Sequence, residues 1–379
     1  MKSAGKLIIF IFSFIFFSGC VEIKKDSDIR NLLLAIVQAF SQSQSQTEII
    51  AVGSNGRGFY SRDGFTWEVV SITGTSGHNF FGVTHTGQNY VAVGTDGVSS
   101  ELIYFSSDGK IWNTVNQINT CPGGGPPALY DVAHGNGFTV AVGRDGPGSN
   151  CVLYSTDHGR TWYGGGLGGI TQSLGKIVFS NSFFYAVHGP SISSSKLYRS
   201  INGSTWTQTS PNGPLFFAGK SIDTAYSLFP ISSQNKIIVA GAKDDTNSDS
   251  ASSFSTDNGA TWTFNTTPIL GGNATSFYAN AMAYNESRLV AVANSCYTDY
   301  SDDTGVNWQS TIQTMGGCSS TSWNSLVYDG SKFIAGGQNT GSLEPVIAVS
   351  AKGAPLDWTV LPTVLPGGNM SINDFAVRR

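Results

Sequence analysis

The sequence carries one short motif seven times, and this repeat constrains the fold more than any other feature. Each copy begins with serine, continues with glycine and ends in tryptophan, and six copies have Asp or Asn two residues after the serine. The tryptophans lie 45, 50, 44, 56, 46 and 50 residues apart. They are Trp67, Trp112, Trp162, Trp206, Trp262, Trp308 and Trp358. Such intervals indicate structural repeats that bury their apolar surfaces against one another.

Every repeat except the first holds four segments with the character of short strands. In the third repeat, two of them precede the motif at residues 131–134 and 138–143, and two more flank the motif itself. Only 12% of the residues are charged and 46 are glycine, a composition typical of strands joined by turns. Four strands per repeat match one blade of a β-propeller. The sequence therefore predicts an all-β, seven-bladed β-propeller of four-stranded blades over residues 47–379.

The two ends of the repeat region complement each other. The first repeat begins directly at Glu48 and lacks the innermost strand that the other repeats have. Residues 371–377 form a strand-like segment that belongs to no complete repeat. Pairing this segment with the first repeat would close the ring and leave no open sheet edge. We therefore predict that the C-terminal strand completes the first blade.

The motif has a local structural explanation. An Asp or Asn side chain at a turn accepts hydrogen bonds from backbone N–H groups, and glycine adopts the positive φ that such turns need. The tryptophan then packs on the turn. The residues with this structural role are predicted to be Asp63, Asp108, Asp157, Asn202, Asp257 and Asp303. The seventh copy is degraded, because it has Lys352 at this position and Asp357 before its tryptophan.

The pattern Ser-x-Asp-(x)-Gly-x-Thr-Trp resembles the Asp-box, or bacterial neuraminidase repeat, over residues 47–379. Proteins with this repeat include sialidases, xyloglucan hydrolases, sortilin-type receptors and photosystem assembly factors. The resemblance implies that the motif lies on the outer turn between the third and fourth strands of each blade, away from the ligand face. It does not select an activity, because these proteins share the blade and not the function.

No catalytic residue and no cofactor are predicted. A sialidase-like enzyme would typically begin with an Arg-Ile-Pro segment, and none occurs. Other glycosidases need two facing carboxylates about 5–10 Å apart. The acidic residues placed on inner strands are Asp131 and Asp374, which lie two blades apart, and Asp131 is expected to form an ion pair with Lys176. Glycoside hydrolysis therefore stays as the third-ranked function.

One acidic segment resembles the start of a calcium-binding loop. Asp245, Asn247 and Asp249 alternate along the chain as oxygen ligands would. The segment lacks the glycine at the sixth position and the closing glutamate that such loops carry. The preferred interpretation is a solvated acidic loop, so no metal is predicted.

The first twenty residues have the pattern of a bacterial lipoprotein signal. Two lysines precede an apolar run over residues 7–17, which is too short to span a bilayer. A Ser-Gly pair then precedes Cys20 and resembles a lipobox, which implies a signal peptide of residues 1–19 and lipidation of Cys20. Phe17 stands where a lipobox usually has leucine, so ordinary signal cleavage or an uncleaved anchor is the alternative.

Cys20 also determines the predicted location. Val21 follows it in place of aspartate, which implies sorting to the outer membrane of a bacterial cell envelope. Acyl chains on Cys20 would hold the protein on the membrane. Residues 20–46 are predicted to be a flexible tether, with a short amphipathic helix over 28–40 as the alternative. The net charge of −4 disfavours nucleic acid as a partner.

The four remaining cysteines predict two disulfides. Exported proteins form disulfides readily, and these four cysteines fall in loops around the third and sixth blades. Their positions favour the pairs Cys121–Cys151 and Cys296–Cys318. Both bonds would hold loops on the face opposite the repeat motifs.

The same face carries the two long insertions, at residues 121–127 and 243–253. Variable loops on a rigid scaffold commonly carry recognition, although such loops also tolerate insertion without any ligand. We expect this face to bind an external protein or glycan. The second-ranked function is an envelope scaffold that assists assembly of another complex.

Overall fold

The computed structural model describes most of residues 47–379, which form one all-β unit. The described residues are 47–117, 121, 126–146, 149–166, 172–188, 196–209, 216–217, 220–243, 250–265, 267, 269–271, 278–309, 313–362 and 369–379. The predicted lipidation site Cys20 and the calcium candidates Asp245, Asn247 and Asp249 lie outside the described residues. Within the described residues, no helix is long and apolar enough to cross a bilayer.

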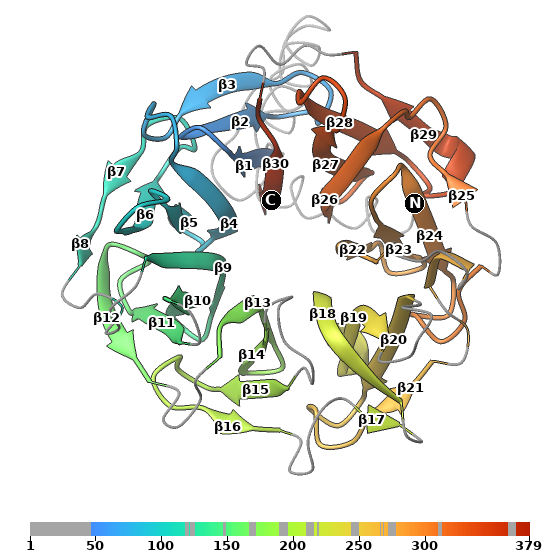
Figure 1. Ribbon diagram of the computed structural model, residues 1–379, viewed down its shortest axis with the longest axis horizontal. Helices are drawn as coiled ribbons and strands as arrows, with labels where there is room; N and C mark the ends of the chain where they lie inside the picture. Colours follow the sequence, from blue (N-terminus) through green and yellow to red (C-terminus); the bar gives the residue numbers. More distant parts are fainter. Residues whose placement is uncertain are drawn as a thin grey trace, which may run out of the picture. The chain divides into compact units, whose positions relative to one another are not determined.

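Seven sheets stand around a ring, which confirms the predicted seven-bladed propeller (Figure 1). The strands of each blade are given from the innermost outward. Blade 1 consists of β30 (Ile372–Arg378), β1 (Glu48–Gly53), β2 (Arg57–Ser61) and β3 (Glu68–Ser71), and blade 2 of β4 (Asn79–His85), β5 (Tyr90–Thr95), β6 (Glu101–Ser106) and β7 (Asn113–Thr114). Blade 3 consists of β9 (Pro127–Gly135), β10 (Phe138–Asp145), β11 (Asn150–Ser155) and β12 (Thr161–Gly165). Two blades also carry one extra short strand, β8 (Asn116–Gln117) beside β12 and β17 (Phe216–Phe217) beside β18.

The other four blades repeat the antiparallel order. Blade 4 consists of β13 (Leu174–Ser180), β14 (Phe183–His188), β15 (Leu197–Ser200) and β16 (Thr207–Gln208), and blade 5 of β18 (Lys220–Ile231), β19 (Lys236–Lys243), β20 (Ser250–Ser255) and β21 (Thr263–Phe264). Blade 6 consists of β22 (Ala281–Tyr284), β23 (Leu289–Val292), β24 (Tyr297–Ser301) and β25 (Gln313–Thr314), and blade 7 of β26 (Thr321–Tyr328), β27 (Phe333–Asn339), β28 (Pro345–Ser350) and β29 (Trp358–Val360). Short 3-10 turns occur at η1 (Ser232–Gln234), η2 (Ile269–Gly271) and η3 (Pro355–Asp357).

The C-terminal strand closes the ring, as the sequence predicts. β30 pairs antiparallel with β1, with Asp374 opposite Val52. Ile372 and Phe375 of β30 are buried in the same apolar cluster as Ile49, at the junction of blades 7 and 1. The last residues of the chain therefore supply both backbone hydrogen bonds and core packing to the first blade.

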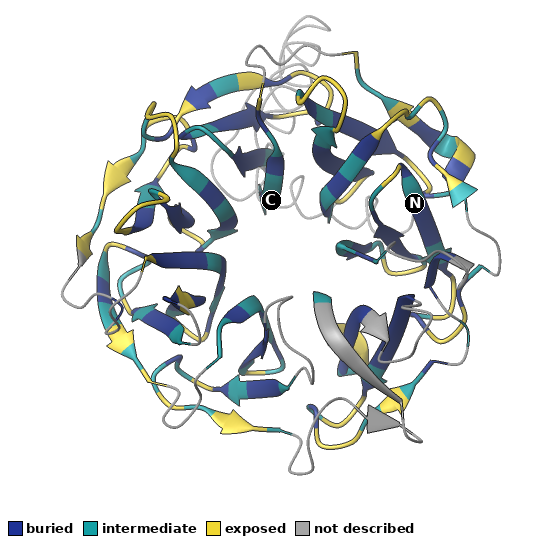
Figure 2. Cartoon of the chain, viewed as in Figure 1, coloured by how far each residue is buried: buried dark blue, intermediate teal, exposed yellow. Residues whose placement is uncertain are grey.

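The core lies between neighbouring blades. Among the described residues, one apolar cluster occupies each of the seven blade junctions. The second strand of a blade is buried on both faces, and all six residues of β5 are buried. Figure 2 shows the buried strands inside the ring and the exposed residues on the outermost strands and the turns. Each blade is therefore stabilised by its two neighbours.

Each repeat motif forms a turn between the third and the outermost strand of its blade, and we call these seven turns the repeat turns. In blade 3, Ser155 Oγ donates a hydrogen bond to Asp157 Oδ1 at 2.8 Å, and Gly159 N donates to Ser155 Oγ at 3.0 Å. Thr161 N donates to Asp157 Oδ1 at 2.8 Å. Trp162 Nε1 donates to the carbonyl oxygen of Gly159 at 2.9 Å. The side chains of Ser155 and Asp157 therefore make these hydrogen bonds within their own turn.

The seventh repeat turn reaches a similar arrangement with a different carboxylate. Ser350 Oγ donates to Asp357 Oδ2 at 2.8 Å, and Lys352 N donates to the same oxygen at 2.7 Å. Gly353 N donates to Ser350 Oγ at 2.7 Å, as the glycine does in the other turns. Asp357, next to the tryptophan, thus replaces the acidic residue that is missing where Lys352 stands.

The carboxylates of the repeat turns predict a loss of stability in acid. Burial raises the pKa of Asp257, but hydrogen bonds from Thr261, Ser255 and Ala260 outweigh it and hold the pKa below its usual value. A depressed pKa contributes stability above the unfolded pKa of about 3.9, and that contribution is lost as the pH falls through the folded pKa. We expect Asp257→Ala to lower the free energy of unfolding by about 1–2 kcal/mol at pH 7.

Asp257→Asn is the matched control, because Asn202 fills the same position in blade 4. It should lose less stability at pH 7 than the alanine variant, and its unfolding temperature should fall less steeply between pH 5 and pH 2. Thermal unfolding monitored by circular dichroism measures both effects. If the unfolding temperatures of the wild type and Asp257→Asn fall equally steeply between pH 5 and pH 2, the carboxylate of Asp257 is not a cause of the loss of stability in acid.

Candidate functional site

The propeller has two faces with different contents. The hairpins between the two innermost strands share a face with the repeat turns, since Asn89 Nδ2 donates to the carbonyl oxygen of His158 at 3.0 Å. We call this the turn face. The loops between the second and third strands and the connections between blades emerge on the opposite side, which we call the loop face. Antiparallel pairing within each blade fixes this division.

Both disulfides lie on the loop face. Cys121 in the connection before β9 is bonded to Cys151 in β11, with Cα atoms 5.3 Å apart. Cys296 before β24 is bonded to Cys318 in the connection before β26, with Cα atoms 5.8 Å apart. These are the two pairs predicted from the sequence. The first bond ties the connection between blades 2 and 3 to β11 of blade 3, and the second ties the loop before β24 of blade 6 to the connection between blades 6 and 7.

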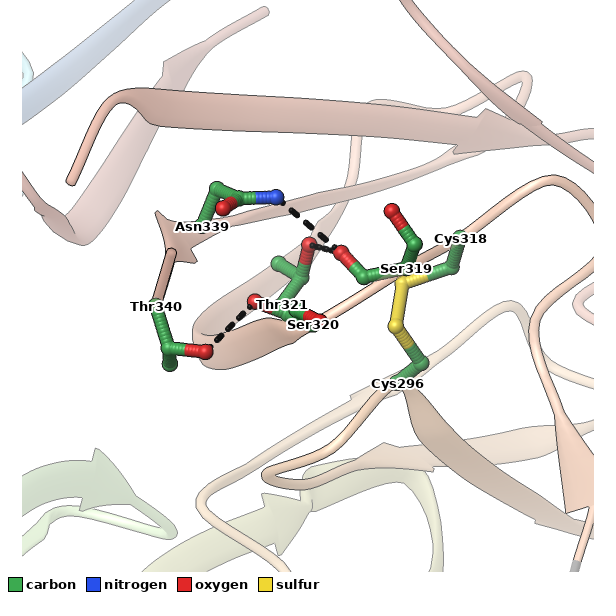
Figure 3. The surroundings of a disulfide bond; sticks show 7 residues. All are labelled: Cys296, Cys318, Ser319, Ser320, Thr321, Asn339 and Thr340. Carbon is green, nitrogen blue, oxygen red and sulfur yellow. Dashed lines mark hydrogen bonds between the residues drawn. A yellow bond between two sulfur atoms is a disulfide. The ribbon is translucent and has the colours of Figure 1, made fainter. Parts of the chain in front are cut away.

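The loop that carries Cys318 is also held by hydrogen bonds to blade 7 (Figure 3). Asn339 Nδ2 donates to the carbonyl oxygen of Ser319 at 3.1 Å, and Thr340 Oγ1 donates to that of Ser320 at 2.9 Å. This part of the loop face is therefore a fixed surface. The long insertions lie mostly outside the described residues, at 122–125 and 244–249. The predicted bounds of the second insertion are wrong at its end, because residues 250–253 belong to β20 and not to a loop.

The innermost strands share an irregularity that the sequence does not reveal. Six of them have a β-bulge at the same height, which adds one residue to the inner strand. The added residues, which we call the bulge layer, are Phe81, Tyr130, Gly175, Tyr226, Asn324 and Asn373. In blade 6, Asn280 has the equivalent position, because its N–H donates to Val292 O at 2.9 Å beside the Ala281–Val292 pair.

The residue after each bulge faces the centre of the ring. These seven residues, which we call the cavity layer, are Gly82, Asp131, Lys176, Ser227, Ala281, Ser325 and Asp374. All except Gly82 line a central cavity of about 230 Å³. Inner strands begin at the loop face, so the bulge layer lies one residue nearer to that face than the cavity layer. The two layers together define the candidate site.

The two carboxylates of the cavity layer connect neighbouring blades. Asp131 Oδ2 accepts a hydrogen bond from Ile177 N of blade 4 at 2.9 Å, and Asp374 Oδ2 accepts one from Val83 N of blade 2 at 2.9 Å. Ser325 Oγ of blade 7 donates to Asp374 Oδ1 at 3.1 Å. Both carboxylates of the glycosidase alternative are thus engaged in bonds between blades.

Lys176 interacts with both carboxylates. Burial lowers the pKa of this ammonium, but the charges of Asp131 and Asp374 outweigh burial and raise it. Burial also raises the pKa of Asp131 and raises that of Asp374 to about 6, while Lys176 opposes both shifts. The predicted ion pair of Asp131 with Lys176 is therefore not formed in direct contact, and Lys176 acts on Asp131 and Asp374 only through the longer-range attraction of opposite charges. Within the described part of the chain, no salt bridge in direct contact joins them.

The bulge layer is aromatic on two sides of the ring. Phe81 and Tyr130 contact each other at the junction of blades 2 and 3, with ring centroids 5.7 Å apart. Tyr226 of blade 5 stacks on Tyr278 before blade 6, at 4.7 Å and an interplanar angle of 9°. All four rings are half-buried, so part of each faces solvent.

In blades 6, 7 and 1 the bulge layer consists of asparagines, which bridge to the next blade. Asn280 Nδ2 donates to the carbonyl oxygen of Trp323, and Asn324 Nδ2 donates to that of Ile372, at 2.8 and 3.0 Å. Asn373 Nδ2 donates to that of Phe80 at 2.7 Å. Sequence reasoning missed this layer, because only the strand register shows that these residues share one position. Over the described ranges, no cluster of three His, Cys, Asp or Glu side chains could hold a metal ion.

Comparison with known proteins identifies the fold and no closer relationship. No protein-family model matches the chain, and no curated protein matches it. A solved structure described as YCF48 bound to D1 peptide is similar at 13% identity and a TM-score of 0.52, covering 84% of each chain. YCF48 from Cyanidioschyzon merolae is similar at 14% identity and a TM-score of 0.54, covering 75% of this chain and 85% of that one. At such identities the similarity supports the propeller fold alone.

Proposed function

We propose that this chain is a bacterial outer-membrane lipoprotein whose Asp-box propeller binds an external protein or glycan through the loop face. In this proposal, residues 1–19 are the signal peptide, Cys20 carries the lipid, and 20–46 is the tether of the propeller. The propeller has no catalytic role and no cofactor.

One observation carries the proposal, namely the contrast between the two faces. On the turn face, the aspartate carboxylates of the repeat turns accept hydrogen bonds from other groups of the same turn. On the loop face, two disulfides hold the connections, and the bulge layer, which includes the half-buried Tyr130 and Tyr226, lies nearer to this face than the cavity layer does. Rigid loops around a hollow with aromatic residues are typical of recognition surfaces.

The second candidate is an envelope assembly scaffold. It is supported by the fold similarity to YCF48, of which one solved structure has a D1 peptide bound. In this case the partner would be a protein segment of an envelope complex. The glycoside hydrolase alternative stays third, because both Asp131 and Asp374 bind backbone N–H groups of neighbouring blades.

The test is chemical crosslinking of the tagged protein in living cells, followed by mass spectrometry of the attached partners. We expect a specific partner to be captured, and deletion of 122–125 or 244–249, which leaves β9, β19 and β20 intact, to abolish the capture. The matched control is Leu356→Ser on the turn face, where this side chain is 89% exposed, and it should leave the capture unchanged. Cys20→Ala should release the protein from the membrane fraction.

The outcomes separate the candidates. Capture of one envelope protein through these loops would favour the scaffold. Protease accessibility on intact cells together with binding of an external molecule would favour the first function. Capture that persists in both loop deletions and is lost in Leu356→Ser would overturn the assignment of the loop face.

A further inference from the structure

We propose that the central cavity binds a free α-amino acid in its zwitterionic form, with a neutral side chain. This goes beyond the proposed function, because it does not depend on what the loop face binds. The observation that carries it is the division of charge among the cavity-layer residues that line the cavity. These residues are Asp131, Lys176, Ser227, Ala281, Ser325 and Asp374.

The acceptors lie on the two blades that flank blade 2, whose own cavity-layer residue is Gly82. Asp374 belongs to β30 of blade 1 and Asp131 to β9 of blade 3. Asp131 accepts hydrogen bonds from two backbone N–H groups, and Asp374 accepts them from two backbone N–H groups and from Ser325 Oγ. A carboxylate has about four acceptor sites, so each group can accept a further hydrogen bond. The ammonium group of the ligand would bind here.

The donors lie on the next two blades. Lys176 belongs to β13 of blade 4 and Ser227 to β18 of blade 5. The Lys176 ammonium and Ser227 Oγ make no hydrogen bond to another described residue, so both can donate to a ligand. Both side chains line the cavity. The carboxylate of the ligand would bind here.

The cavity wall below the donors is apolar. Val178 and Phe229 follow Lys176 and Ser227 by two residues, so they face the centre of the ring one step nearer to the turn face. Both are half-buried and line the same cavity. The volume of about 230 Å³ is below the range of about 300–1,000 Å³ that holds a drug-sized ligand. A small molecule with a neutral side chain therefore fits this space.

A ligand with both charges satisfies both sides of the cavity. A simple anion would be repelled by Asp131 and Asp374, and a simple cation would leave Lys176 without a partner. A charge without a partner is costly where water is partly excluded. Asp131 and Lys176 attract each other from neighbouring blades without direct contact. An α-amino acid carries its ammonium and carboxylate groups on one carbon atom, so it can bridge these two side chains.

The test is saturation-transfer NMR with the full chain in detergent and with alanine, valine, leucine, aspartate and lysine as free amino acids. We expect transfer to at least one of the three neutral amino acids and weaker binding of the two charged ones. Leucinamide lacks the carboxylate and N-acetyl-leucine lacks the ammonium group, so each should bind at least about tenfold more weakly than leucine.

Two variants test the location of the site. Ala281→Leu places a larger side chain in the cavity without changing its charge and should abolish binding. In Lys176→Met, leucine should lose its advantage over leucinamide, because the partner of the ligand carboxylate is removed. Phe65→Ala, at a ring that is 53% exposed on the turn face, is the control and should bind like the wild type.

Three outcomes would overturn the proposal. They are no transfer to any neutral amino acid from folded protein, equal affinity of the wild type for leucine and its two derivatives, and undiminished binding by folded Ala281→Leu. Failure of the amino acids leaves the proposed function intact if the crosslinking still depends on the loops. Failure of the crosslinking leaves the cavity site intact if the amino acids bind.

Discussion

Deletion of residues 371–379 is expected to prevent folding, because β30 is the innermost strand of blade 1. The strand pairs with β1 along its length and buries Ile372, Phe375 and Ala376. Without it, β1 becomes an open sheet edge and the junction of blades 7 and 1 loses part of its core. The measurement is the yield of soluble protein, together with circular dichroism and an unfolding temperature.

Two further variants make this prediction specific. Deletion of Arg379 alone removes an exposed residue and should leave the unfolding temperature close to that of the wild type. A synthetic peptide of residues 369–379, added during refolding of the truncated chain, should restore soluble protein because it can pair with β1. A truncated chain that unfolds cooperatively near the wild-type temperature would show that closure by β30 is dispensable.

The propeller could be predicted from the sequence because its determinants are local and repeated. The serine, the acidic residue, the glycine and the tryptophan of a repeat turn interact within eight residues of one another, so their spacing records the turn directly. Ring closure could be predicted because one blade lacks a strand at its start and the chain ends in a strand. The disulfide pairs followed from the loops that the blade order brings to the same face.

The candidate site could be predicted only in part, because it depends on the register of the inner strands. Asp131, Lys176 and Asp374 were recognised as inner-strand charges, but the backbone N–H partners that the two carboxylates bind become visible only once the bulges are placed. The aromatic and asparagine positions of the bulge layer have no common sequence pattern. A bulge adds one residue without changing the alternation of apolar residues enough to be detected.

The asparagine bridges hold the inner strands of blades 6, 7, 1 and 2 at one height. Asn280, Asn324 and Asn373 each donate to a carbonyl oxygen of the following blade, while Asp131 and Asp374 accept from N–H groups of neighbouring inner strands. The free edges of innermost strands would otherwise leave these backbone groups without partners near the cavity. Polar residues at the centre of the ring therefore have a structural use that does not depend on a ligand.

Lys176→Met is expected to lower the free energy of unfolding by about 3 kcal/mol at pH 8, because it leaves the buried Asp131 and the half-buried Asp374 without their shared positive charge. Methionine keeps most of the side-chain volume, so the loss reports charge more than packing. Lys176→Arg keeps the charge and should lose less. Urea unfolding followed by tryptophan fluorescence gives the free energies for the three proteins.

The pH dependence of this loss distinguishes electrostatics from packing. Asp374, with its pKa raised to about 6, binds a proton more tightly in the folded state than in the unfolded one, and Asp131 is shifted in the same direction. Such groups favour the folded state at low pH, and that stability is lost as the pH rises through their raised pKa. Removal of Lys176 raises both pKa values further, so the deficit of Lys176→Met should grow between pH 5 and pH 8. In Lys176→Met combined with Asp131→Asn the deficit should shrink, whereas a loss that is equal at both pH values would assign the effect to packing.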